Sequence, residues 1–180
     1  MRRYILTGTP GAGKTAVLRM LEHLGYPVVE EAATAVIALR HAEGVPDPWR
    51  HESFVDSIVE LQRRRQLAAC PPPSTGDIQV YDRAPVCTYA LATHLGHPIS
   101  ATLESEVDRV VTERVYERRV FLVRSLGFVE PTAARRISYE DSLRFERVHE
   151  ETYRRFGYEL VDVPPGPLAV RVAAIRPLLV

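Results

Sequence analysis

Short apolar runs alternate along the chain with longer stretches in which apolar residues recur at helical spacing. Each run is only a few residues long and ends at a glycine, a proline or a charged residue. Short apolar runs of this kind are typical of strands buried on both faces of a parallel sheet. The pattern predicts strands at residues 4–8, 27–30, 77–82, 119–125 and 158–163.

Helices are predicted between the strands. Val17, Met20, Leu21 and Leu24 share one helical face, and Gly25 ends that helix. Asp47 followed by Pro48 is typical of a helix start, and Ser138 with Asp141 three residues later resembles a capping box. The remaining predicted helices cover residues 31–44, 48–69, 86–94, 100–117, 138–157 and 168–175.

Five strands that alternate with helices predict a three-layer α/β fold with a mainly parallel sheet. At 180 residues, the chain is expected to form one domain over residues 1–180. In such sheets, ligands bind at the carboxyl ends of the strands. The segments that follow the strands are therefore the first places to look for a functional site.

Charge and hydropathy narrow the class of protein. The formal net charge is zero, which argues against nucleic acid or an anionic membrane as the main partner. No apolar stretch reaches the roughly 20 residues of a membrane span, and the run after Arg2 and Arg3 is too short for a signal peptide. Cys70 and Cys87 are far apart and are interpreted as small buried or half-buried hydrophobes, in preference to a disulfide or metal pair. We expect a cytoplasmic protein.

The segment "GTPGAGKT" matches the phosphate-binding pattern G-x-x-x-x-G-K-[ST] in full, between a predicted strand and a predicted helix. Its backbone N–H groups and the following helix N-terminus are suited to bind phosphates. The alternative is a glycine-rich turn that binds nothing. The predicted nucleotide-binding residues are Gly8, Thr9, Pro10, Gly11, Ala12, Gly13, Lys14 and Thr15.

Lys14 is the only lysine in the chain, although lysine and arginine together number 23. Because every other one of these basic residues is arginine, the single lysine indicates that arginine would not serve at position 14. A compact ammonium reaches the β- and γ-phosphates where a planar guanidinium does not fit in the same way. Thr15 is expected to ligate Mg²⁺ through its hydroxyl.

Further candidate residues follow the predicted strands. Asp82 is expected to hold Mg²⁺ directly or through water; alternatively it caps a helix or pairs with Arg83. Arg83 is a candidate for a phosphate or acceptor contact, or for a structural ion pair. Of Glu30 and Glu31, Glu31 is the first choice as the base that takes the proton of an attacking hydroxyl, and its alternative role is to begin a helix.

A predicted loop before residue 138 carries Arg135 and Arg136, which could close over a triphosphate or remain solvated. His94 and His97 are interpreted as surface histidines, and Gln62 as a candidate acceptor contact. Trp49, Phe54 and Tyr89 are interpreted as core residues, and residues 63–65 as a solvated helix face.

The chain resembles the small AAA-domain ATPases that are similar to nicotinamide-riboside kinase and, more distantly, to deoxynucleoside kinases. The resemblance spans nearly the whole chain. One departure is Ala84, where those relatives more often have serine or glycine. The residues that carry the resemblance are "GTPGAGKT", "VVEEAA" (28–33), "YDRAPVCTYAL" (81–91) and "FGYELVDVP" (156–164).

The resemblance implies a kinase-like P-loop fold with strand order 2-3-1-4-5, and ATP or GTP with Mg²⁺ as cofactors. By position, Glu31 matches the base of the kinase relatives. Asp82 and Arg83 match their acidic–arginine pair, and Arg135 and Arg136 match their lid. The absence of an N-K-x-D motif favours ATP over GTP.

Two functions follow from these features. The first is a kinase that transfers the γ-phosphate of Mg-ATP to a hydroxyl of a small molecule. The second is a nucleotide-dependent switch or slow NTPase without a small-molecule acceptor. A nucleic-acid-processing ATPase is disfavoured by the zero net charge. The sequence names neither the acceptor nor the oligomeric state.

Overall fold

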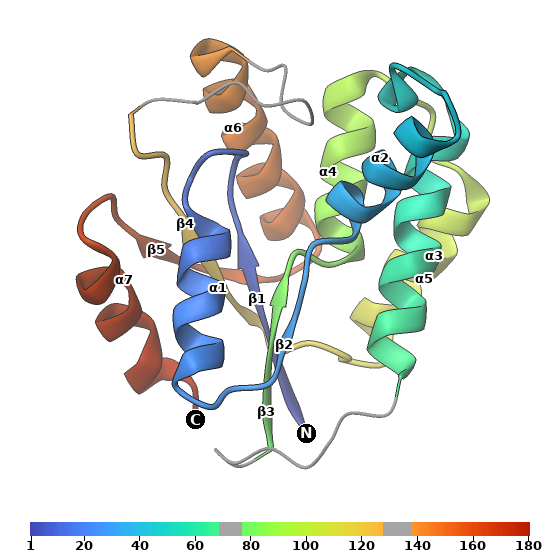
Figure 1. The fold of residues 1–180 in the computed structure, drawn as a ribbon. Helices are drawn as coiled ribbons and strands as arrows, with labels where there is room; N and C mark the ends of the chain where they lie inside the picture. The colour runs from blue at the N-terminus through green and yellow to red at the C-terminus, as the bar shows by residue number, and fades with distance from the viewer. Residues whose placement is uncertain (69–76, 128–137) are drawn as a thin grey trace.

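A computed structural model describes residues 1–68, 77–127 and 138–180. Its centre is a five-stranded sheet with the order β2-β3-β1-β4-β5, in which every neighbouring pair is parallel (Figure 1). The predicted sheet and strand order are confirmed. The strands are β1 (Arg2–Thr7), β2 (Val28–Val29), β3 (Ile78–Asp82), β4 (Arg119–Val123) and β5 (Glu159–Val163).

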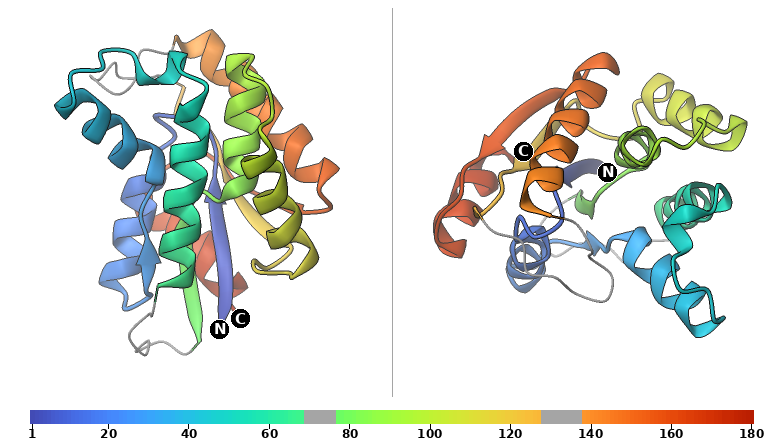
Figure 2. Two further views of the ribbon diagram at one scale, coloured as in Figure 1. Left: turned by 90° about the vertical axis from the view of Figure 1, so that its right-hand side faces the viewer. Right: turned by 90° about the horizontal axis from the view of Figure 1, so that it is seen from above.

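Helices cover both faces of the sheet. Helices α1 and α7 pack on one face, and α3, α4, α5 and α6 lie on the other (Figures 1 and 2). No helix in the described parts of the chain is long and apolar enough to cross a membrane. The helices are α1 (Lys14–His23), α2 (Ala32–Ala42), α3 (Ser53–Leu67), α4 (Pro85–Leu95), α5 (Ala101–Thr112), α6 (Tyr139–Arg155) and α7 (Leu168–Ile175), with 3₁₀ turns η1 (Pro48–Arg50) and η2 (Arg176–Leu178).

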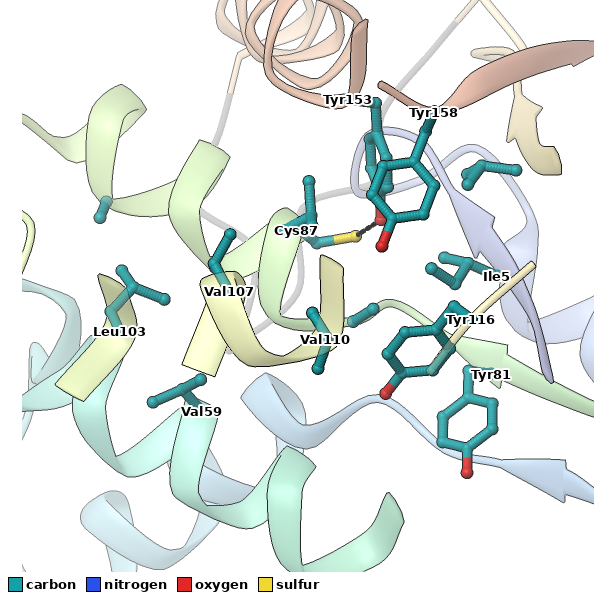
Figure 3. Close-up of a cluster of buried hydrophobic side chains, with 14 of the residues drawn as sticks. Ile5, Val59, Tyr81, Cys87, Leu103, Val107, Val110, Tyr116, Tyr153 and Tyr158 are labelled. Atoms are coloured by element: carbon teal, nitrogen blue, oxygen red, sulfur yellow. Dashed lines mark hydrogen bonds between the residues drawn. The ribbon is translucent and has the colours of Figure 1, made fainter. Parts of the chain in front are cut away.

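The alternation of side chains along each strand divides the core into two layers. Tyr4 and Leu6 of β1 point into the layer beneath α1 and α7. Ile5, between them, points into the opposite layer, as expected for the two-residue period of a strand. In that second layer the Tyr153 hydroxyl lies 2.8 Å from the Cys87 sulfur (Figure 3). Cys87 is buried, as predicted, and Cys70 lies outside the described residues.

A smaller apolar cluster joins α2 to α3, away from the sheet. Ala32 and Val36 of α2 pack there against Phe54 and Ile58 of α3. Helix α2 of this pair lies beyond the carboxyl end of β2, and α3 runs from beside α2 back along the sheet (Figure 1). The cluster between α2 and α3 therefore forms a wall beside the edge of the sheet at which parallel α/β proteins bind their ligands.

Two helix boundaries differ from the prediction by several residues. The helix expected from Pro48 begins as the 3₁₀ turn η1, and extended backbone at His51 separates it from α3. The Asp47 side chain makes no capping hydrogen bond, so the proline alone did not start an α-helix. The helix predicted to reach residue 117 ends at Thr112. The Ser138 cap is confirmed, because its hydroxyl accepts the Asp141 N–H at 3.0 Å.

A Gly8→Ala substitution should destabilise the fold strongly. Gly8 has φ +131°, and a Cβ there would lie 2.3 Å from the Val123 carbonyl oxygen. Unfavourable backbone conformation and overpacking together predict a loss of about 3 kcal/mol or more in the free energy of unfolding. The matched control is Gly44→Ala, where φ is +84° but no atom lies within 4 Å. It should lose only about 1 kcal/mol. Equal losses in urea unfolding would contradict this interpretation.

Candidate active site

The loop between β1 and α1 has the backbone geometry of an anion cradle. Gly8, Gly11 and Gly13 adopt φ values of +131°, +84° and +81°, which residues with a Cβ rarely adopt. Gly13 directly precedes α1, and no side chain caps that helix N-terminus. The first N–H groups of a helix have no intrahelical partner and carry a partial positive charge. The loop and the helix end can therefore bind phosphate.

Lys14 is held inside this loop. The residue is 6% exposed, and its ammonium donates a hydrogen bond to the Thr9 carbonyl oxygen at 2.9 Å. Burial, followed by the positive charge of Arg83, lowers its pKa to about 8. A phosphate brought to the loop would add to the negative charge that Asp82 and Glu31 already place near this cation. Thr15, the next residue, is exposed at the start of α1.

Glu31 and Arg83 form an ion pair across the carboxyl ends of β2 and β3. Arg83 Nε donates to Glu31 Oε1 at 2.6 Å, and the Thr34 hydroxyl donates to Glu31 Oε2 at 2.8 Å. Burial alone would raise the pKa of Glu31, but the charges of Arg83 and Lys14 outweigh it and lower the pKa to about 2. The carboxylate is therefore ionised at neutral pH.

His149 of α6 supports the other side of Arg83. The imidazole is fully buried, and its Nδ1 lies 2.9 Å from the Phe145 carbonyl oxygen. A carbonyl only accepts, so Nδ1 carries the proton and Nε2 accepts from Arg83 Nη1 at 2.9 Å. Burial and then the Arg83 charge hold the pKa of His149 well below its usual value. A neutral imidazole thus fixes a guanidinium whose own backbone has φ +73°.

His149 was missed by sequence reasoning. Its one signal is its position four residues after Phe145 in a predicted helix, on the face that turns inward. That signal indicates burial but names no partner. The bond to Arg83 joins positions 66 residues apart, and no local pattern encodes such a contact.

Asp82 is buried at the end of β3, opposite Leu6 of β1 in the sheet register. Its negative charge raises the pKa of Lys14, against the effect of burial. No cluster of three or more His, Cys, Asp or Glu side chains that could hold a metal occurs in the described ranges. A metal at this place would depend on few protein ligands, such as Thr15 and Asp82, which fits Mg²⁺ because it keeps several waters and binds phosphates.

A cavity of about 520 Å³ is lined by Lys14, Glu31 and Arg83 together with mostly apolar side chains, and its apolar part is called the chamber. Lys14 and Thr15 line it on the side of the loop, and Glu31 and Arg83 also line it. Gln62 and Thr88 add a polar pair to the wall, with the Thr88 hydroxyl donating to Gln62 Oε1 at 2.9 Å. Outside the glycine-rich loop, the apolar and aromatic lining residues are Ala33, Ile37, Trp49, Phe54, Ile58, Cys87, Leu91, Leu95 and Phe145.

Two histidines interpreted as surface residues have specific contacts. His94 is half-buried, lines the cavity and stacks on Phe145 with ring centroids 4.5 Å apart, so its surface interpretation was wrong. His97 lies with Nε2 2.7 Å from the Trp49 carbonyl oxygen. Trp49 and Phe54, expected in the core, pack in or against the cluster between α2 and α3 and also line the cavity.

The two predicted lid residues, Arg135 and Arg136, lie outside the described residues. Their role over a triphosphate stays a prediction. The structure does bring the other predicted residues to one edge of the sheet, because β2, β3 and β1 are neighbours. Lys14, Glu31 and Arg83 share one cavity.

This combination of sheet order, glycine-rich loop and strand-end carboxylates defines a P-loop protein with a kinase-like fold. The chain belongs to the AAA domain family, whose sequence profile matches residues 3–171. No protein among the curated sequences compared with it matches significantly.

Several solved structures share the fold. A NadR protein in complex with NAD and AMP-PNP aligns with TM-score 0.67 at 16% identity, covering 98% of this chain, and the chain spans about half (48%) of that protein. Deoxyadenosine kinase from M. mycoides aligns with TM-score 0.62 at 12% identity, covering 98% of this chain and 97% of its own. Shikimate kinase from Acinetobacter baumannii aligns with TM-score 0.52 at 15% identity, covering 99% and 91%. At these identities the likeness establishes the fold.

The Glu31 pair should make stability depend on acid pH. Its pKa in the folded chain is about 2, below the ordinary 4.5. The ionised pair therefore stabilises the fold fully above pH 4.5, and this contribution disappears as the pH falls toward 2. A Glu31→Gln variant should lose about 2–3 kcal/mol at pH 7 relative to wild type, and the difference should shrink below pH 4.5. Glu30→Gln, which alters an exposed ion pair with Arg19, is the control. A pH-independent difference in urea unfolding would contradict the assignment.

Proposed function

We propose that the chain is an ATP-dependent phosphotransferase, which passes the γ-phosphate of Mg-ATP to a hydroxyl of a small molecule. Residues 1–180 would act as one nucleotide-binding domain. The observation that carries the proposal is that Lys14, Glu31 and the apolar residues of the chamber line one cavity. A nucleotide-dependent switch needs a phosphate loop, but it does not need an apolar chamber beside an ionised carboxylate.

In this proposal, the loop from Gly8 to Thr15 holds the triphosphate through backbone N–H groups and Lys14. Its positive-φ glycines and the open end of α1 support that role. Bound Mg²⁺, held by Thr15 and Asp82, would supply positive charge that neutralises the phosphates. The lid prediction for Arg135 and Arg136 adds arginine charge at the transferring group.

Glu31 would accept a hydrogen bond from the acceptor hydroxyl and orient it toward the phosphate. With its pKa lowered to about 2, it is a weak base but a permanent acceptor of hydrogen bonds. Positioning and charge stabilisation supply most of the catalysis in phosphoryl transfer, so an orienting carboxylate suffices. Arg83, fixed by Glu31 and His149, would face the phosphate or the acceptor.

The chamber suggests the general character of the acceptor. Its aromatic and aliphatic walls favour a ring or hydrocarbon body, and Gln62 with Thr88 offers a place for one or two polar groups. The fold is shared with solved structures named deoxyadenosine kinase and shikimate kinase, which supports a kinase without naming this acceptor.

The deciding experiment measures ADP release from Mg-ATP, with and without a panel of nucleosides and hydroxylated natural products. We expect release to rise with one class of acceptor and to vanish in Lys14→Ala, because the loop then lacks its ammonium. Slow release that no acceptor changes, but that Lys14→Ala abolishes, would support the switch or slow NTPase instead.

Glu31→Gln should lower kcat for the stimulated reaction by ~10²–10⁴, because the amide is a poorer acceptor for the substrate hydroxyl. Glu30→Gln, on the neighbouring exposed carboxylate, should leave the rate close to wild type. Rates in steady-state assays at saturating ATP test this. An unchanged kcat in Glu31→Gln would remove Glu31 from the proposed mechanism.

A further inference from the structure

Arg171 reaches the phosphate loop from the other end of the chain. It lies in α7, is 3% exposed, and donates from Nη1 to the Ala12 carbonyl oxygen at 2.8 Å. Nη2 donates to the Arg124 carbonyl oxygen at 3.1 Å, just beyond β4. The guanidinium therefore bridges the loop and the end of a neighbouring strand.

The charge of Arg171 has no carboxylate partner among the described residues. Both of its hydrogen bonds go to backbone carbonyls, and its Nε is buried with no hydrogen-bond partner in the described parts of the chain. Burial lowers its pKa. By contrast, Arg124 nearby pairs with Glu146, Glu150 and Asp162. A buried cation without a counter-ion is costly. The buried position of Arg171 therefore indicates a role beyond stabilising the free protein.

The hydrogen bond from Arg171 fixes the orientation of the peptide between Ala12 and Gly13. A trans peptide is planar, so the Ala12 carbonyl and the Gly13 N–H point in opposite directions. By holding the carbonyl toward α7, Arg171 keeps the Gly13 N–H on the opposite side of the loop. Space at the contact is limited as well, because a Cβ at Gly13 would lie 2.9 Å from Arg171 Nη1. The glycine and the arginine fit each other.

We propose that Arg171 is a positioning residue of the phosphate site. It holds the Ala12–Gly13 peptide with its N–H presented to the phosphates, and its buried charge lies beneath the loop as part of their counter-charge. This inference rests on the proposed nucleotide binding. It places a determinant of phosphate affinity on α7, which contributes no residue to the lining of the cavity in the described parts of the chain.

The test compares Arg171→Met, Arg171→Lys and Arg176→Met by calorimetric titration with inorganic pyrophosphate and with Mg-ADP. Arg176 is an exposed arginine directly after α7 and is the matched control. We expect Arg171→Met to weaken both ligands by about 10- to 100-fold, as for loss of a charged hydrogen bond. Arg171→Lys keeps the charge but cannot bridge two carbonyls, so it should fall between. Arg176→Met should bind as wild type does.

The unfolding temperature of each free variant separates positioning from a purely structural role. A structural role would lower that temperature and leave affinity for pyrophosphate unchanged, which would overturn the inference. If Arg171→Met does not fold, Arg171→Lys decides: wild-type affinity in that variant would overturn the inference. If wild-type protein binds neither ligand, the proposed function itself fails and the inference fails with it.

Discussion

Buried positive charge at the carboxyl edge of the sheet is the constraint around which this site is organised. Lys14, Arg83 and Arg171 are 6%, 8% and 3% exposed, and each cation raises the cost of burying the next. The fold offsets that cost with Glu31 on Arg83, with a neutral imidazole at His149, and with backbone carbonyls on Lys14 and Arg171. Asp82 also places negative charge near Lys14, and the uncapped N-terminus of α1 leaves the loop suited to an anion.

The order of the strands brings these groups together. Because β1 lies between β3 and β4, the segment after β1 has Arg83 on one side and the Arg124 backbone on the other. The strand β2 adds Glu31 beyond β3. A parallel sheet aligns the carboxyl ends of all its strands at one edge. Residues separated by most of the chain thus become neighbours at the ends of adjacent strands.

Sequence reasoning predicted what local patterns encode. The strands, the glycine-rich loop and the Ser138 cap each depend on residues adjacent in sequence or one helical turn apart. It missed His149 and Arg171, whose partners lie 66 and 159 positions away. It placed His94 at the surface, because the ring that covers it, Phe145, belongs to another helix. It also extended a helix through His51, where one extended residue interrupts it.

Helix α6 carries two of these distant contacts on neighbouring turns. Phe145 forms part of the chamber wall, and its carbonyl oxygen holds His149, which in turn holds Arg83. Phe145 and His149 are one helical turn apart, so the backbone that carries the Phe145 ring in the chamber wall also fixes the imidazole behind Arg83. The chamber wall and the guanidinium are consequently linked through one turn of α6. Any molecule that contacts Phe145 in the chamber therefore touches the same helical turn that holds the imidazole of His149 against Arg83.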